Sequence, residues 1–248
     1  VPIPGQGHVH GDRFRIAYVG RISQRQKRIL DVGGAIISAL EAIPEADAAF
    51  FGHGDETPRL RRLVEESGMA QRIEIAGSVD PSRIQSCLLA FDVVVLLSDY
   101  EGTPGALMDA MACGLVPVVL DIPGGVRELV INDETGVLVK DRDREFVDAI
   151  KDLHKMVERR AELGQRARDH ITARFSLRRA ADLWEELFES LRAEAGRSSP
   201  IGSASRLRLP QPVPALVPHM HCKPPPLRRL LAAAQRILFR SPSSSTQI

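Results

Sequence analysis

The sequence predicts an α/β protein built on a doubly wound parallel sheet of Rossmann-like type. Short β-branched apolar runs alternate with segments whose apolar residues recur at helical spacing, as in successive β-α-β units. One run, DVVVLLS at 92–98, is apolar almost throughout, which indicates a strand covered on both faces. Beyond residue 142 the pattern becomes helical, and beyond residue 195 it becomes rich in Pro and Ser. We therefore expect C-terminal helices followed by a disordered tail.

The strands are expected at six short runs of mainly apolar residues. The first of them, RFRIAYVG, ends at Gly20. The expected strands are residues 13–20, 47–52, 72–77, 92–98, 116–120 and 136–139.

Helical patterns fill the intervals between these strands. Residues 27–42 and 58–66 form the first two expected helices. Asp80 and Pro81 have the side chains preferred at an N-cap and at the first helical position, so the third helix is expected to begin there. The fourth helix lies within DYEGTPGALMDAMACGLVPVV at 99–119 and leads into the fifth strand.

Residues 143–193 are expected to be helical over most of their length. The last helix, FSLRRAADLWEELFESL at 175–191, has Ser176 as its expected N-cap. Its apolar residues recur at intervals of three or four and would form one stripe. The stripe consists of Leu177, Ala181, Trp184, Leu187, Phe188 and Leu191.

Composition narrows the classes of function. Residues 196–248 contain eight Lys or Arg and no acidic residue. The preceding body therefore contains 25 of the 33 basic residues and all 32 acidic residues, so it is acidic on balance. An acidic body argues against nucleic acid as the main ligand. Cys87, Cys113 and Cys222 are far apart and form neither a disulfide framework nor a metal motif. No apolar run reaches the roughly 18 residues of a membrane span, and we expect a cytoplasmic protein.

We divide the chain into a linker remnant at 1–13, a domain at 14–195 and a disordered tail at 196–248. Within the tail, LRRLLAAAQRILF at 227–239 is a short basic amphipathic pattern. We expect it to be solvated with fleeting helicity, and contact with a membrane surface or a partner is the alternative.

Candidate binding residues follow the carboxyl ends of the strands, where open α/β sheets hold their ligands. Gly20, Arg21 and Lys27 follow the first strand, and the fourth leads into a glycine-rich turn and a helix near Pro104. Glycine backbone, two cations and a helix N-terminus together favour a phosphate-bearing ligand. The alternative is that Arg21 and Lys27 are solvated surface charges. Neither the dinucleotide fingerprint nor a P-loop is present, which disfavours NAD and simple ATP hydrolysis.

Taken together, these motifs resemble the C-terminal, donor-binding half of the retaining glycosyltransferases of family 4, which have the GT-B fold. The resemblance covers about residues 14–192. It depends on the order and spacing of YVGRISQRQK, FFGHGDE, IEIAGSV, SDYEGTPGALMDAMACGLVPVV, GGVRELV and ETGVLV.

The resemblance implies a role for each matching residue. Arg21 and Lys27 would hold the diphosphate of a UDP- or GDP-sugar, and Glu101 would lie at the donor sugar and the reacting centre; these three are the expected catalytic residues. Asp109 would bind the ribose, although the family usually has the longer Glu at this position. Each acid could instead be a polar turn or surface residue. Further donor-binding positions are Gly20, Gly102, Thr103, Pro104, Gly105 and Ala106, with Ser78 and Val79 near the base. The resemblance requires neither a metal nor a resident cofactor.

The sequence thus predicts a glycosyltransferase domain that moves a sugar, with retention, from a nucleoside diphosphate to an unknown acceptor. In the family a second Rossmann-like domain supplies most acceptor contacts, so we expect this chain to be a fragment, a truncated product or half of a split enzyme. The last helix of the family packs on that domain, so Trp184 or Phe188 is expected to be partly exposed. The alternatives are a non-catalytic nucleotide-sugar-binding module and, third, a nucleotide-sugar epimerase of related architecture.

Overall fold

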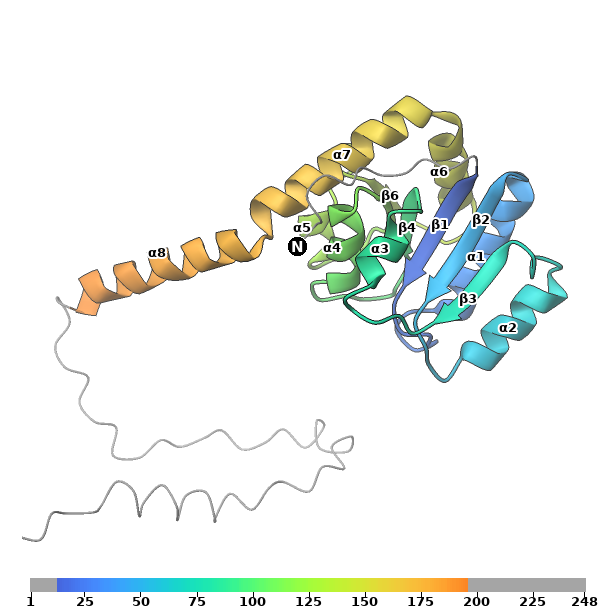
Figure 1. Ribbon diagram of the computed structural model, residues 1–248, viewed down its shortest axis with the longest axis horizontal. Coiled ribbons are helices and arrows are strands. Elements are labelled where there is room, and N and C mark those ends of the chain that lie inside the picture. Colours follow the sequence, from blue (N-terminus) through green and yellow to red (C-terminus); the bar gives the residue numbers. More distant parts are fainter. Residues whose placement is uncertain (1–12, 196–248) are drawn as a thin grey trace, which may run out of the picture. The chain divides into compact units, whose positions relative to one another are not determined.

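The computed structural model describes residues 13–195, so residues 1–12 of the expected linker, the expected tail and the basic pattern at 227–239 lie outside the described residues. Six strands form one parallel sheet in the order β3-β2-β1-β4-β5-β6 (Figure 1). This arrangement confirms the predicted doubly wound sheet. The strands are β1 (Phe14–Val19), β2 (Ala46–Phe51), β3 (Ile73–Gly77), β4 (Val93–Leu96), β5 (Val116–Leu120) and β6 (Val137–Val139).

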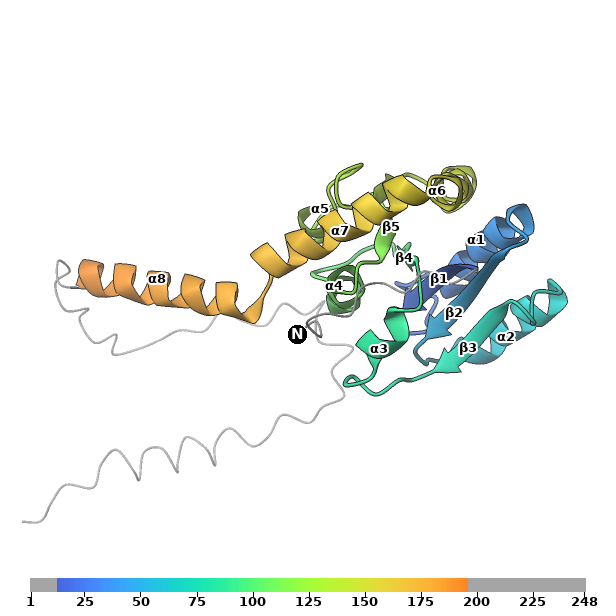
Figure 2. The ribbon, with the colours of Figure 1, turned by 45° about the horizontal axis from the view of Figure 1, so that its top comes forward.

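Helices cover both faces of the sheet. Helix α1 packs against α2 and α6, whereas α4 packs against α3 and α7. Figure 2 shows α1 and α2 on one side of the strands and α3 and α4 on the other. Every residue of β4 and β5 is buried, as their apolar sequences require. The helices are α1 (Ile29–Ala42), α2 (Thr57–Glu66), α3 (Ile84–Leu88), α4 (Gly105–Ala112), α5 (Val126–Leu129), α6 (Arg144–Lys155), α7 (Val157–Arg174) and α8 (Leu177–Ala195).

The third helix begins at Ile84, three residues later than the sequence predicts. The carboxylate of Asp80 accepts the N–H of Ser82 at 2.8 Å, and its carbonyl accepts the N–H of Arg83 at 2.8 Å. Asp80 therefore closes a turn ahead of α3 and is not its N-cap. Helix α1 also begins late, at Ile29, because Arg28 has a left-handed φ of 52°. Lys27 consequently lies in the preceding loop.

A buried ion pair holds the corner between α6 and α7 to the amino end of the sheet. Arg160 of α7 places its Nε 3.3 Å from Asp92 Oδ1, and it donates to the carbonyl of Leu153 at 2.7 Å. The other oxygen of Asp92 accepts the N–H of Arg15 at 2.9 Å. The amino end of the sheet is thus a structural anchor, at the edge opposite to the expected site.

Both edge strands have a polar side chain on an outward backbone group. The N–H of Asp121 donates to the carbonyl of Val139 at 2.8 Å, so the backbone groups of Val139 point toward β5. Because these directions alternate along a strand, the N–H and carbonyl of the neighbouring Leu138 point away from β5. The N–H of Leu138 donates to Asn132 Oδ1 at 2.9 Å. At the other edge, a guanidinium nitrogen of Arg61 lies 3.4 Å from the carbonyl oxygen of Ile75.

Helix α8 begins as predicted, with Ser176 Oγ accepting the N–H of Arg179 at 3.2 Å. Its apolar stripe is exposed: Trp184 is 58% and Phe188 is 55% accessible, and their rings stack with centroids 5.6 Å apart. The expected exposure of these two side chains is confirmed. Within residues 13–195, every helix is too short or too polar to span a bilayer.

Candidate functional site

The expected site lies at the carboxyl ends of β1 and β4, where the strand order reverses and ligands bind in sheets of this kind. Two loops meet there. The loop after β1 carries Arg21 and Lys27, and the loop after β4 carries Glu101. Because the two strands are hydrogen-bonded neighbours, residues separated by more than 70 positions in the sequence come into contact.

Lys27 and Glu101 form a shielded ion pair. Lys27 Nζ lies 2.6 Å from Glu101 Oε1, and their side chains are only 15% and 7% exposed. The other carboxylate oxygen lies 3.4 Å from Gln26 Nε2. Lys27 is therefore not a solvated surface charge, which removes that alternative for this residue. The sequence placed both residues at the site but gave no sign that they contact each other.

The side chain of Arg21 is exposed, whereas its backbone is held by a hydrogen bond from a side chain of β1. The hydroxyl of Tyr18 donates to the carbonyl of Arg21 at 2.8 Å. Burial, followed by the nearby charge of Glu101, raises the pKa of Tyr18 well above that of a free phenol, so this hydroxyl keeps its proton.

Close approach of glycine backbone joins the loops after β1 and β2. Gly52 has a φ of 143°, and a Cβ on it would lie 1.9 Å from the carbonyl oxygen of Gly20. A Cβ on Gly54 would lie 2.0 Å from the carbonyl oxygen of Ile22. Only glycine permits these contacts, which hold the backbone on both sides of Arg21.

The turn that carries Glu101 has a second glycine contact, with the loop after β5. A Cβ on Gly125 would lie 2.2 Å from the carbonyl oxygen of Gly102. Gly124 has a φ of 109°, and a Cβ on it would lie 3.1 Å from the carbonyl oxygen of Glu101. The sequence motif GGVRELV thus supports the turn through its first two residues, and the short α5 follows.

Helix α4 presents its N-terminus beside this turn. The first N–H groups of a helix have no intrahelical acceptor, so those of Gly105 and Ala106 are available to an anion. Thr103 is exposed, and a Cβ added to Gly102 or Gly105 would meet nothing within 4 Å, so the space beside the turn is open.

Asp109 lies on the exposed face of α4, one turn after Gly105. The opposite face of the helix, with Leu107, Ala110 and Met111, is buried. This exposure is compatible with a ligand contact and with a plain surface acid, so the role of Asp109 stays a prediction.

Ser78 and Val79 lie after β3, two strands away from β1 in the sheet. Ser78 Oγ is 2.6 Å from His53 Nδ1, which ties the loop after β3 to the loop after β2. The structure therefore places Ser78 and Val79 at the same edge of the sheet but not in contact with Lys27 or Glu101.

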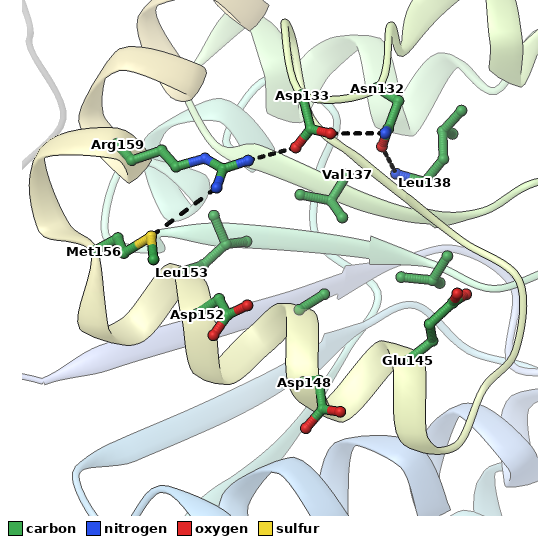
Figure 3. A pocket seen from close by; sticks show the side chains of 12 residues that line it. Asn132, Asp133, Val137, Leu138, Glu145, Asp148, Asp152, Leu153, Met156 and Arg159 are labelled. Carbon is green, nitrogen blue, oxygen red and sulfur yellow. Dashed lines mark hydrogen bonds and ion pairs between the residues drawn. The ribbon is translucent and has the colours of Figure 1, made fainter.

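A separate cavity of about 480 Å³ lies along β6 and α6 (Figure 3). Asp148 and Asp152 project from α6, and Arg159 forms an ion pair with Asp133 at the rim. None of its lining residues belongs to the expected site. Among residues 13–195, no group of three or more His, Cys, Asp or Glu side chains could hold a metal ion.

Residues 4–170 match the family of glycosyl transferases group 1. Over 179 residues the chain is 26% identical to poly(ribitol-phosphate) alpha-N-acetylglucosaminyltransferase of Staphylococcus aureus, covering 69% of this chain and 35% of that protein. Over 161 residues it is 31% identical to 2-deoxystreptamine N-acetyl-D-glucosaminyltransferase of Streptomyces fradiae, covering 63% and 36%. The chain thus spans about a third of the length of these two curated relatives.

Solved structures give the same picture of the fold. The C-terminal domain of the glycosyl transferase group 1 family protein LpcC from Francisella tularensis is 25% identical, with a TM-score of 0.60 over 66% of this chain and 87% of that one. A TarM mutant of S. aureus, in complex with fondaparinux, alpha-GlcNAc-glycerol and UDP, has a TM-score of 0.67 at 22% identity, over 75% and 36%. These similarities confirm the Rossmann-like fold of the GT-B type.

Proposed function

This chain belongs to the glycosyltransferases of group 1, and from that premise we propose that it is the donor-binding part of an enzyme that transfers a sugar from a nucleoside diphosphate. The observation that carries the proposal is the shielded Lys27–Glu101 pair beside the N-terminus of α4. TarM, a structural neighbour, is bound to UDP, which supports a nucleotide donor here. Because the chain spans about a third of its curated relatives, the acceptor and the complete transfer reaction are part of the proposal.

The chemistry follows from where charge develops. When the sugar leaves, negative charge builds on the terminal phosphate of the nucleoside diphosphate. Arg21, Lys27 and the first turn of α4 would stabilise this charge with two cations and free N–H groups. A lysine ammonium has three N–H donors, so Lys27 can hold Glu101 and a phosphate oxygen at the same time.

The carboxylates would select the rest of the donor. Glu101, fixed by Lys27 at 2.6 Å, would accept hydrogen bonds from hydroxyls of the sugar, and Asp109 from hydroxyls of the ribose. The motifs quoted above also support retention of configuration and membership of family 4. We propose that no metal is required, because the two cations and α4 already oppose the charge of the leaving group.

Isothermal calorimetry with UDP and GDP tests the site directly. We expect measurable binding of one nucleotide, at least tenfold weaker in Lys27→Ala and weaker in Arg21→Ala. Arg25→Ala is the matched control, because Arg25 is an exposed cation of the same loop. If the unaltered chain binds neither nucleotide at millimolar concentration, the proposed function is wrong.

A nucleotide-sugar-binding module without transfer activity is the second candidate. It is favoured by the exposed stripe on α8, which shows that a large apolar surface of this chain has no cover among the described residues. Assay of donor consumption with the chain alone separates the two: sustained turnover excludes the module, whereas nucleotide binding without turnover supports it.

A further inference from the structure

Arg142 reaches from the loop after β6 to the end of β4. Its Nε donates to the carbonyl of Leu97 at 2.7 Å, and a terminal nitrogen donates to Asp99 Oδ1 at 2.5 Å. The side chain is 22% exposed, so it is held mostly out of solvent. One guanidinium therefore fixes two points of the segment that leads from β4 to Glu101.

Asp99 is also tied to the loop after β1. Its N–H donates to the carbonyl of Gln26 at 3.0 Å. The side chain of Gln26 returns the contact, donating to the carbonyl of Tyr100 at 2.8 Å. The turn before Glu101 is thus held between two loops, one carrying Arg142 and the other carrying Lys27.

These contacts matter because the turn is not a regular element. Residues 97–104, between β4 and α4, belong to neither a helix nor a strand, and Asp99, Tyr100 and Gly102 are exposed. Without cross-links, the carboxylate of Glu101 would have to be ordered when the sugar binds, and that ordering weakens binding. A guanidinium suits the task because its planar, rigid fork holds a carbonyl and a carboxylate in a fixed relative geometry, whereas an ammonium on a flexible stem does not fix that geometry.

We propose that Arg142 is a positioning residue for Glu101, acting through the Leu97 carbonyl and the Asp99 carboxylate. The inference rests on the proposed function, in which Glu101 contacts the donor sugar. Arg142 itself contacts neither Glu101 nor any other residue assigned to the donor site. It lies at the carboxyl edge of the sheet, whereas the Asp92–Arg160 anchor lies at the amino edge.

Calorimetry of the full chain with UDP, UDP-glucose and UDP-N-acetylglucosamine tests this role. We expect Arg142→Ala to leave the Kd for UDP within about twofold. The ratio of the Kd for UDP to the Kd for the UDP-sugar measures the affinity that the sugar adds, and this ratio should fall at least fivefold in Arg142→Ala, as it should in Glu101→Gln. Asp99→Ala should behave like Arg142→Ala. Asp99→Asn should lie close to the unaltered chain, because its amide oxygen still accepts from the guanidinium.

Arg144→Ala is the control, since Arg144 is 91% exposed and pairs only with Asp148, on its own helix, among the contacts of the described residues. Hydrogen exchange of the ligand-free chain gives a readout that needs no donor. In Arg142→Ala, amides of residues 97–103 should exchange faster, with the Tm lowered by less than about 4 °C.

Each outcome decides a specific claim. If the unaltered chain binds neither UDP nor GDP, the proposed function fails and this inference with it. If it binds GDP and not UDP, the same comparison is made with GDP and GDP-sugars. If it binds UDP and a UDP-sugar, and Arg142→Ala binds both equally well with unchanged exchange, only the positioning role is overturned. A parallel loss of UDP and UDP-sugar affinity, or a large fall in Tm, would make Arg142 a structural residue. Equal affinity of the unaltered chain for UDP and both UDP-sugars would remove the sugar contact of Glu101, and the inference would fall.

Discussion

Lys27 and Glu101 owe their contact to the order of the strands, since each residue lies on a loop that leaves one of two neighbouring strands. Their side chains are almost removed from water, and a buried charge is tolerated only beside an opposite one. A ligand that approaches this pair therefore meets charges already held in place. Preorganised charges are the ones that stabilise a leaving group most effectively.

Asp109 offers the sharpest test of a single residue. Because it is exposed on α4, we expect Asp109→Ala to leave the Tm unchanged while UDP binds about fivefold more weakly, the loss of roughly 1 kcal/mol for one hydrogen bond. Asp109→Glu should retain binding, because the longer acid still presents a carboxylate to the ribose. Calorimetry and thermal unfolding measure the two quantities; unchanged UDP affinity with a lower Tm would make Asp109 a structural surface residue.

The residues themselves could be named from the sequence, but their partners could not. Arg21, Lys27 and Glu101 stand out because they lie in loops that follow strands, and Asp109 because the family resemblance gives it a role. Arg142 gave no such signal, since it lies 43 residues after Asp99 and meets it only because the loop after β6 crosses the end of β5.

Helix α1 contains two adjacent glycines that should respond oppositely to substitution. A Cβ on Gly34 would meet nothing within 4 Å, so Gly34→Ala should stabilise the protein by about 0.5–1 kcal/mol, the cost of glycine in a helix. A Cβ on Gly33 would lie 2.9 Å from Leu60 Cδ1 and 3.1 Å from Leu63 Cδ2, so Gly33→Ala should gain less or lose stability. Urea unfolding measures the free energy of unfolding of both variants. An equal gain in the two would show that Leu60 and Leu63 of α2 shift to accommodate the added methyl group without cost.

The elements that the sequence predicts well are those that local pattern alone decides. β4 and β5 are apolar throughout, a pattern that predicts strands covered on both faces, and every one of their residues is buried. α3 begins later than expected because Asp80 bonds to Ser82, a choice between two local hydrogen bonds that its sequence leaves open. α5 was not predicted, because four residues are too few to show a helical period.

The protein as a whole should lose stability in alkali. Burial, followed by the charge of Asp109, raises the pKa of Cys113 from 9.0 to about 11. The folded state therefore holds this proton more tightly than the unfolded state, so the contribution is complete below pH 9 and is lost as pH rises toward 11. Tyr18 shifts in the same direction.

Urea unfolding between pH 8 and 11 measures this effect, with Cys113→Ala as the control. We expect the free energy of unfolding to fall more steeply in the unaltered chain than in the variant. Parallel pH profiles would mean that the thiol ionises equally in both states.

Trp184 reports on the surface of α8. It is the only tryptophan of the chain, and it is more than half exposed beside Phe188. We expect red-shifted emission and strong quenching by acrylamide in the native protein, approaching that of the urea-unfolded chain. A blue-shifted, protected signal would instead show that the stripe is covered in solution.

The side-chain contacts at the two edge strands bear on aggregation of the protein at high concentration. An open edge recruits strands from other molecules and leads to fibrils. Asn132 already occupies the outward N–H of Leu138, and Arg61 lies against the outward carbonyl of Ile75. One outward backbone group at each border of the sheet is therefore engaged by a side chain, and a strand that paired at that position would first have to displace it.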